Sequence, residues 1–409
     1  MAIIAALTPP GTEVSITDEN VSDIYFEKET DLVGITTMTI TAQRAYQIAD
    51  IFRARGVKVV LGGSHPSALP EEASQHADAV VIGEAEGIWP KVIEDFQNNK
   101  LDRIYEQQKR PSLENLPIPR RDLFKKGAYY VENTISTTRG CPYNCSFCSV
   151  TSFFGHTYRR RPIDEIIKEI EAMDLKKPIA FIDDNVFGNP KFAKELLRAL
   201  IPYKIRWAAQ ASVAIAEDDE LLRLAAASGC IALLVGFETL STANLAAIGK
   251  KVNVVEEYES VIRRIHSHGI SIHGFFILGL DNDGESVFQR TVRFAQKTRL
   301  ESAQFAWPVP YPGTALYESL ERDGRIVTEE WSQFETRPVF EPKLMSREML
   351  HQGCDWAWRE FYSLSSILKR IGVLHRNLIP FWATNLSFRA SWKRKSRSGW
   401  FATPRLSGY

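Results

Sequence analysis

The sequence predicts an α/β protein with two parallel-sheet domains and a mainly helical C-terminal region. Two stretches, 1–105 and 131–325, alternate short runs rich in β-branched residues with amphipathic stretches of helical period. The short runs are apolar at nearly every position, which is typical of parallel strands buried on both faces. A proline-rich, charged stretch, 106–130, is typical of an interdomain linker. Residues 326–409 form the predicted helical region.

The composition is that of an ordinary globular protein. Hydrophobic residues make up 44% and charged residues 24% of the 409 residues, which excludes a disordered chain and a disulfide-stapled miniprotein. Fifty basic residues balance fifty acidic ones, so a globally basic nucleic-acid-binding protein is not expected. No apolar run approaches the roughly 18 residues that span a bilayer, and the start lacks a secretory signal pattern. We therefore expect a cytoplasmic protein.

The first domain has the pattern of an open parallel sheet. Strands are expected at 13–17, 32–36, 58–61 and 79–82, and helices at 42–55 and 87–96. Glycine-rich turns follow the last two strands, at 62–66 and 83–87. Loops at the carboxyl ends of parallel strands form ligand crevices, and glycine lets a large planar ligand approach the backbone.

The second domain has the pattern of repeated βα units. Six strands are expected, at 134–138, 179–182, 206–213, 231–237, 271–278 and 302–307, separated by helices at 163–175, 191–200, 218–227, 254–266 and 285–297. Parallel barrels bind ligands at the carboxyl ends of their strands. The polar residues expected to contact a ligand there are Asp183, Asp184, Gln210, Ser212 and Glu238. Asp281 and Asp283 are instead interpreted as helix N-caps.

Three of the five cysteines fall within one short loop, Cys141-Pro-Tyr-Asn-Cys145-Ser-Phe-Cys148. Three thiolates can hold three corners of a cubane iron–sulfur cluster, which normally takes four cysteines. The remaining iron then keeps an open position for a substrate or cofactor. The alternative is a structural zinc site, but His156 lies outside the usual ligand spacing. Cys230 and Cys354 are interpreted as buried apolar residues.

The cysteine motif, with Phe147 before the last cysteine, resembles the signature of the radical S-adenosylmethionine (SAM) superfamily. The resemblance implies a [4Fe-4S] cluster on the three cysteines, a partial (β/α)6 barrel, and SAM bound at the open iron. It places Phe147 near the adenine and makes Asp183, Asp184, Gln210, Ser212 and Glu238 candidate SAM contacts. Reductive cleavage of SAM in that superfamily yields a 5′-deoxyadenosyl radical that abstracts hydrogen from substrate.

Further segments resemble the cobalamin-binding branch of that superfamily, which includes hopanoid C-methylases and anaerobic porphyrin-ring cyclases. They are Phe181–Asn185, Gly236–Glu238 and Tyr311–Thr314. The resemblance implies a Rossmann-like cobalamin-binding domain at the N-terminus. Its expected cofactor contacts are Thr36, Thr37, Gly62, Gly63, Ser64, His65, Gly83 and Glu84.

Two departures from that branch bear on cobalamin. The D-x-H-x-x-G motif, which supplies a lower-face histidine ligand, is absent. The domain also begins late, at a segment (2–9) that follows a first strand in the family. Loss of that strand would unpair a sheet edge. The sequence leaves open a misassigned start, a truncation, or a domain that no longer binds cobalamin.

The C-terminal tail differs in charge from the rest of the chain. Residues 361–409 hold nine basic and no acidic residues, interleaved with Phe381, Trp382, Phe388, Trp392, Trp400, Phe401 and Tyr409. This pattern suits peripheral contact with an anionic membrane surface. It also suits nucleic acid, or a merely solvated helix face with a frayed end.

The hypothesis that follows is a radical SAM enzyme that methylates an unactivated carbon of a hydrophobic small-molecule or lipid substrate with cobalamin. A flavodoxin- or ferredoxin-type electron donor is implied. One alternative is cobalamin-independent radical oxidation, cyclisation or rearrangement with a degenerate N-terminal domain. Another is a non-catalytic iron–sulfur protein that binds membrane or RNA through its tail.

Overall fold

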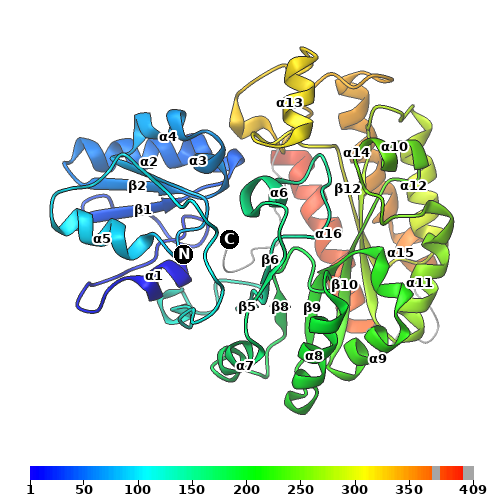
Figure 1. The fold of residues 1–409 in the computed structure, drawn as a ribbon. Coiled ribbons are helices and arrows are strands. Elements are labelled where there is room, and N and C mark those ends of the chain that lie inside the picture. The colour runs from blue at the N-terminus through cyan, green and yellow to red at the C-terminus, as the bar shows by residue number, and fades with distance from the viewer. Residues whose placement is uncertain (371–377, 399–409) are drawn as a thin grey trace.

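The computed structural model describes residues 1–370 and 378–398 and shows two α/β domains followed by a helical region (Figure 1). The N-terminal domain lies to one side of the barrel domain, and the C-terminal helices pack on the barrel. The predicted α/β fold class, with two parallel sheets and C-terminal helices, is confirmed. Among the described residues, no helix is both long and apolar enough to cross a bilayer.

The N-terminal domain has a four-stranded parallel sheet whose strands follow chain order. These strands are β1 (Leu32–Thr36), β2 (Lys58–Gly62), β3 (Ala79–Ile82) and β4 (Ile104–Glu106). One face packs on α2 (Ala42–Ala54), α3 (Ser64–Ala68) and α4 (Pro70–His76). The other packs on α5 (Trp89–Gln97) and α1 (Ala2–Leu7).

Two strand predictions for this domain need correction. The segment 13–17, expected as a strand, has no regular secondary structure. A strand needs a neighbour for its backbone hydrogen bonds, and β1 pairs only with β2 in the described sheet. The short β4 was not predicted, and it lies where the linker was expected to start. Three residues are too few for a period to show in the sequence.

The second domain contains all six predicted strands in one parallel sheet. They are β5 (Asn133–Ile135), β8 (Ile179–Phe181), β9 (Trp207–Ala211), β10 (Cys230–Glu238), β11 (Ser271–Ile277) and β12 (Ser302–Ala306), paired in chain order. No pairing joins β5 to β12 within the described sheet, so the barrel is partial. The outer face packs on α7 (Ile163–Glu171), α8 (Pro190–Leu200), α9 (Asp219–Ala227), α11 (Tyr258–Ser267) and α12 (Ser286–Lys297).

The C-terminal region packs on both domains. After α13 (Ala315–Arg322), Trp331 and Phe334 enter the core of the N-terminal domain, where the indole of Trp331 donates to Glu72 at 3.0 Å. Helix α14 (Arg347–Phe361) then covers the edge of β12, and the indole of Trp358 donates to the carbonyl of Phe305 at 2.7 Å. Residues distant in sequence thus hold the two domains together.

The basic tail is partly a packing element. It forms α15 (Leu364–Arg370) and α16 (Leu378–Ser398). Arg370 is buried and donates to the carbonyls of Leu300 and Glu301, both at 2.9 Å. Phe381 is also buried, so this ring is not available to a membrane surface. The predictions for Trp400, Phe401 and Tyr409 lie outside the described residues.

We expect Gly229→Ala to destabilise the barrel. Gly229 begins the turn into β10 with φ at +96°, and an added Cβ would lie 1.8 Å from the carbonyl oxygen of Ile205. The clash and the strained backbone should lower the free energy of unfolding by about 3 kcal/mol or more. Chemical denaturation followed by tryptophan fluorescence measures this. At Gly284 an added Cβ meets no atom within 4 Å, so equal losses in Gly284→Ala would contradict the explanation.

Candidate functional site

The cysteine loop lies at the carboxyl end of the barrel sheet. It follows β6 (Thr138–Arg139) and ends at α6 (Ser149–Phe154), whose N-cap residue is Cys148. Cys145 is buried, and the other two thiols are half-buried. Burial raises the pKa of all three thiols, to about 12 for Cys148. The charges of Cys141 and Cys145 also raise the pKa of Cys148, as expected for thiols close together.

The other two cysteines lie elsewhere. Cys230 is buried on β10, and Cys354 is buried within α14. In the part of the chain that the structure describes, no three His, Cys, Asp or Glu side chains converge on a single metal ion. A four-iron cluster is larger than one ion and spreads its ligands over several irons. Three thiols on one loop therefore fit a cluster better than a zinc ion.

A buried lysine faces the cysteine loop. Lys250 pairs with Glu238 at 2.9 Å, and both side chains are nearly buried. Burial alone would lower the pKa of Lys250, but the charges of Glu238 and of the Cys145 thiol raise this pKa above its usual value. Glu238 adopts a positive φ of 62°, and its carboxylate folds back over Gly236, where a Cβ would lie 2.3 Å from Oε1. The Gly236-Phe-Glu238 segment thus places a cation near the thiols.

The other residues predicted to contact SAM lie around the same end of the sheet. Phe147 packs with Leu245, Ile248 and Leu280 between the cysteine loop and the loop after β11. Gln210, on β9, is exposed although it sits in the middle of the sheet. Ser212 lies 3.5 Å from the hydroxyl of Tyr143, within the cysteine loop.

The two aspartates after β8 have different surroundings. Asp183 is 2% exposed, and its Oδ1 accepts hydrogen bonds from the backbone amides and hydroxyls of Thr137 and Thr138. This carboxylate fixes the strand that leads into the cysteine loop. Asp184 accepts from the amide of Gly140 at 3.3 Å. Burial, with the nearby charge of Asp183, raises the pKa of Asp184 to about 6.

The interpretation of Asp281 and Asp283 as helix N-caps is wrong. Asp281 pairs with Arg325 and Lys343, at 2.8 Å each. Asp283 accepts from the amides of Gly279 and Leu280, at 3.1 Å each. Both carboxylates therefore stabilise the loop after β11 rather than the first turn of α12.

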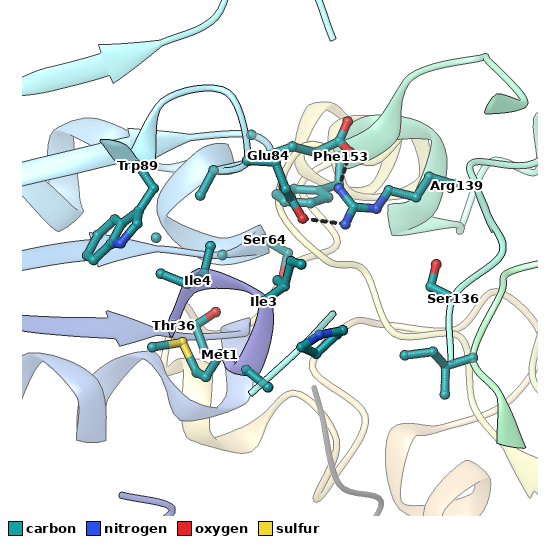
Figure 2. A pocket seen from close by; sticks show the side chains of 18 of the residues that line it. Met1, Ile3, Ile4, Thr36, Ser64, Glu84, Trp89, Ser136, Arg139 and Phe153 are labelled. Atoms are coloured by element: carbon teal, nitrogen blue, oxygen red, sulfur yellow. Dashed lines mark hydrogen bonds and ion pairs between the residues drawn. The ribbon is translucent and has the colours of Figure 1, made fainter. Parts of the chain in front are cut away.

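A cavity of about 550 Å³ lies between the two domains (Figure 2). Seven of the eight residues predicted to contact cobalamin line it: Thr36, Thr37, Gly62, Gly63, Ser64, Gly83 and Glu84. From the barrel side the wall includes Ser136, Ile182, Asp184 and Ser149, directly after Cys148. A Cβ at Gly83 would meet no atom within 4 Å, so bare backbone is open to a bound group.

His65 is the exception among the predicted cobalamin contacts. It is fully buried, with Nδ1 3.3 Å from the hydroxyl of Thr39 and Nε2 3.2 Å from Glu72. Its ring meets Trp331 edge to face at 5.2 Å. The prediction that it contacts the cofactor is corrected, because the side chain points into the core of the N-terminal domain rather than into the cavity.

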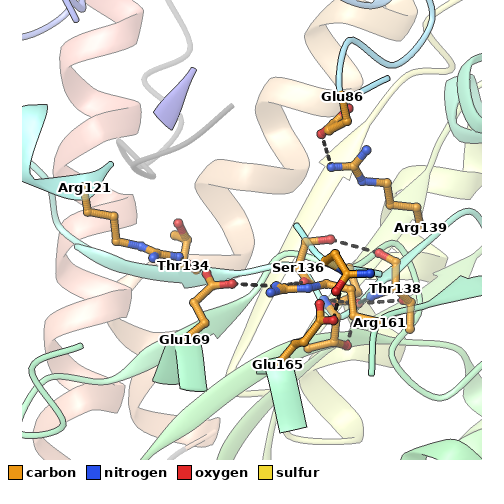
Figure 3. A network of polar contacts seen from close by, with 12 residues as sticks. Glu86, Arg121, Thr134, Ser136, Thr138, Arg139, Arg161, Glu165 and Glu169 are labelled. Carbon is orange, nitrogen blue, oxygen red and sulfur yellow. Dashed lines mark hydrogen bonds and ion pairs between the residues drawn. The ribbon is translucent and has the colours of Figure 1, made fainter. Parts of the chain in front are cut away.

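Buried ion pairs join the cavity wall to the cysteine loop. Glu84 pairs with Arg139 (Figure 2), and Glu86 pairs with the same arginine (Figure 3). Glu84 also pairs with Arg159 at 2.5 Å. The two glutamate side chains are 3% and 7% exposed. Burial alone would raise the pKa of Glu86, but the hydrogen bond from Arg139 holds this pKa below its usual value. Arg139 precedes Gly140 and Cys141, so the first domain directly restrains the loop.

A second charged group closes the cavity near β5. The buried carboxylate of Glu169 pairs with Arg121 from the linker and with Arg161 at 2.6 Å (Figure 3). Arg161 also donates to the carbonyl of Ser136 at 2.9 Å. The linker is thereby fixed against the barrel, so three parts of the chain line the cavity.

Comparison with known proteins identifies both domains. Residues 135–295 match the model of the radical SAM superfamily, and residues 1–93 match that of the B12 binding domain. The bacteriochlorophyllide d C-12(1)-methyltransferase of Chlorobaculum tepidum is 32% identical, over 91% of this chain and 84% of the relative. The C-8(2)-methyltransferase of the same organism is also 32% identical, over 95% and 90%.

A solved structure shares the fold. TsrM from Kitasatospora setae, a radical SAM methyltransferase with cobalamin and a [4Fe-4S] cluster bound, superposes with a TM-score of 0.66 at 15% identity. The match covers 91% of this chain and 90% of that one. The fold and the site thus define a radical SAM enzyme with a B12-binding domain. The chain belongs to the cobalamin-dependent radical SAM methyltransferases.

The cofactors of this family are a [4Fe-4S] cluster, SAM and cobalamin, and the residues present fit them. Three thiols on one loop, with both other cysteines buried elsewhere, leave one iron of a cluster without a protein thiolate. The glycine-lined cavity of the first domain opens beside the same loop. The resemblance recognised from the sequence is therefore confirmed at the level of the family.

Sequence reasoning missed four charged residues of this site: Lys250, Glu86, Arg139 and Arg159. Lys250 stands twelve positions after Glu238, in a loop without a recognised motif. Glu86 lies within the glycine-rich turn at 83–87, and a carboxylate there is usually solvated. Two glutamates in a turn between apolar segments nevertheless indicate a buried ion pair, because a buried carboxylate needs a cation nearby.

We expect Glu84→Gln to loosen the docking of the two domains. The change leaves Arg159 without its carboxylate in a buried setting, which should cost about 3 kcal/mol. Chemical denaturation measures the loss, and limited proteolysis of the 106–130 linker reports the separation. Glu94→Gln, at an exposed position on α5, serves as the matched control. Unchanged stability in Glu84→Gln would show that the ion pairs do not hold the domains together.

Proposed function

We propose that this protein methylates an unactivated carbon of a hydrophobic, flat tetrapyrrole related to the chlorophyllides. The observation that carries the proposal is the shared cavity, whose walls come from the glycine-rich turns of one domain and the cysteine-loop side of the other. Two methyltransferases whose names give a bacteriochlorophyllide as substrate align with nearly the whole chain at 32% identity.

In this proposal the cysteine loop binds the cluster. Cys141, Cys145 and Cys148 supply three thiolates, and the charge of Lys250 offsets part of their negative charge. Phe147 packs beside the nucleoside part of SAM, while Asp184, Gln210, Ser212 and Glu238 offer hydrogen bonds at the carboxyl ends of the strands. Asp183 has a positioning role in this proposal, because four hydrogen bonds engage its Oδ1. Its buried Oδ2 has no partner among the described residues and is the atom proposed to face SAM.

The first domain holds cobalamin in the proposal. Thr36, Thr37, Gly62, Gly63, Ser64, Gly83 and Glu84 form the wall of that part of the cavity. Trp89, Phe153 and Ile4 add apolar surface to the cavity (Figure 2), which keeps water away from reactive species. When bound, the three cofactors supply hydrogen abstraction from the substrate carbon and a methyl group for that carbon.

The balance of the reaction sets the products. One SAM accepts an electron and a hydrogen atom and leaves as methionine and 5′-deoxyadenosine. A second SAM gives up its methyl group, formally as a methyl cation, and leaves as S-adenosylhomocysteine, so joining this methyl group to the substrate carbon takes a second electron. The electrons come from an external donor of flavodoxin or ferredoxin type.

The direct test is anaerobic reconstitution with iron, sulfide, cobalamin, SAM and a reductant, with bacteriochlorophyllide d as the supplied substrate. We expect a product heavier by one methylene unit, together with 5′-deoxyadenosine and S-adenosylhomocysteine, by mass spectrometry. An intact cluster without bound cobalamin at saturating supply would remove the methylation proposal. Oxidised or cyclised product without S-adenosylhomocysteine would favour cobalamin-independent radical chemistry instead.

We expect Cys145→Ala to abolish formation of 5′-deoxyadenosine. Loss of one thiolate leaves two irons of the cluster without a protein ligand, so the cluster should not assemble. Iron content and the visible spectrum after reconstitution measure this loss. The matched control is Cys354→Ala, whose thiol is buried in α14. SAM cleavage that survives in Cys145→Ala would show that the chemistry does not depend on this loop.

A further inference from the structure

Part of the inner face of the barrel sheet is exposed, in contrast to the outer face. On the outer face, Phe237, Phe276 and Phe305 stack against each other at 5.6 and 5.7 Å between ring centres and are fully buried beneath the helices. Alternate residues of a strand point to opposite faces, so their neighbours point into the barrel. Those neighbours are more open: Gln210 is exposed, and His273, Phe275 and Gln304 are half-buried.

Strand register places a polar row across this inner face. Leu234 of β10 is the register partner of Gln210 on β9 and of His273 on β11. His273 is in turn the partner of Ser302 on β12. Ala180 on β8 and Ala208 on β9 are register partners that also point inward. Their small side chains leave space inside the barrel beside this row.

His273 is held in one orientation with one ring nitrogen unused. Its Nδ1 lies 2.8 Å from the hydroxyl of Ser302, and its ring meets Phe275 edge to face at 4.9 Å. Phe388 of α16 approaches the same ring at 5.8 Å. Within the described residues, the structure records no hydrogen bond to Nε2. Because the serine hydroxyl can donate or accept, Nε2 can carry the proton or the lone pair.

Among the described strand residues, no charged side chain points inward in the row that contains Gln210, His273 and Ser302. The charged groups of the barrel interior, Asp184 and the Glu238–Lys250 pair, lie at the rim beside the cysteine loop. Burial lowers the pKa of His273 to about 4, so the ring is neutral at physiological pH. A carboxylate or phosphate would find no compensating charge among these strand side chains. Arg389 of α16, next to Phe388, donates instead to the carbonyl of Tyr362 at 2.9 Å.

We propose that His273, oriented by Ser302, is a specificity-determining residue that binds a neutral hydrogen-bonding group, such as a ring carbonyl, on a flat apolar substrate. The inference rests on the proposed function and deepens it by naming the part of the substrate that enters the barrel. Phe275 and Phe388 flank the histidine and offer aromatic surface to a flat ring. Any ionised group of the substrate stays outside this row.

The test compares substrate binding by the reconstituted protein and by two variants, His273→Leu and His273→Gln. Leucine removes the hydrogen-bonding group at similar bulk, whereas glutamine places an amide near the former Nε2. The probes are two chlorophyllides that differ only in the presence of a ring carbonyl, titrated without reductant and followed by visible absorption. We expect His273→Leu to weaken binding of the carbonyl-bearing probe roughly tenfold. Glutamine should restore part of the affinity.

The probe without the carbonyl should bind the wild type and His273→Leu equally. His268→Leu, at the end of α11 outside the barrel, should leave both affinities unchanged. Iron and cobalamin content, measured for every variant, shows that the cofactor sites are assembled. Because the ring stays neutral, wild-type affinity should not change between pH 6 and pH 8.

The outcomes separate this inference from the proposed function. If His273→Leu binds both probes as the wild type does, the inference is overturned while methylation can still stand. If His273→Leu loses affinity but the wild type forms no methylated product under reduction, the inference stands and the proposed function fails. If the wild type binds neither probe, both are overturned.

Discussion

The buried ion pairs between Glu84, Glu86, Arg139 and Arg159 determine the arrangement of the molecule. A carboxylate buried to this degree is stable only beside a cation. The glutamates belong to the glycine-rich turn of the first domain. The arginines belong to β6 and to β7 (Arg159–Arg160), an antiparallel pair that frames the cysteine loop. Within its own domain alone, neither the glutamate pair nor the arginine pair would have an opposite charge to offset its burial. The docking of the two domains therefore also places the cavity beside the thiols.

Much of the fold followed from periodicity in the sequence. The six barrel strands are apolar and regularly spaced, and their helices have strong amphipathic patterns, so both were predicted within a few residues. The exceptions depend on tertiary context. Residues 13–17 have strand-like composition but no partner strand, and β4 is too short to show a pattern. The packing of Phe381 and Arg370 against the barrel could not be read from a basic, aromatic tail.

The candidate site divides in the same way. The sequence indicated the position of the cysteine loop and of the glycine-rich turns at strand ends, because both patterns are local: ligand spacing in one loop, and glycines directly after a strand. Lys250 and Arg139 matter through charges that reach them from other elements, and His65 was misplaced because a loop position does not reveal the direction of a side chain. Ion pairs between segments that are distant in the sequence are the features of the site that could not be predicted from one sequence.

The insertion of Trp331 and Phe334 into the N-terminal core has a consequence for engineering. The cofactor domain is not a simple module ending at the linker, because residues from beyond the barrel complete its hydrophobic interior. A chimera that exchanges this domain between relatives must therefore carry two separate pieces of sequence, the N-terminal part and the matching segment around 331–339. A graft of the first piece alone would leave an apolar hole beside Glu72.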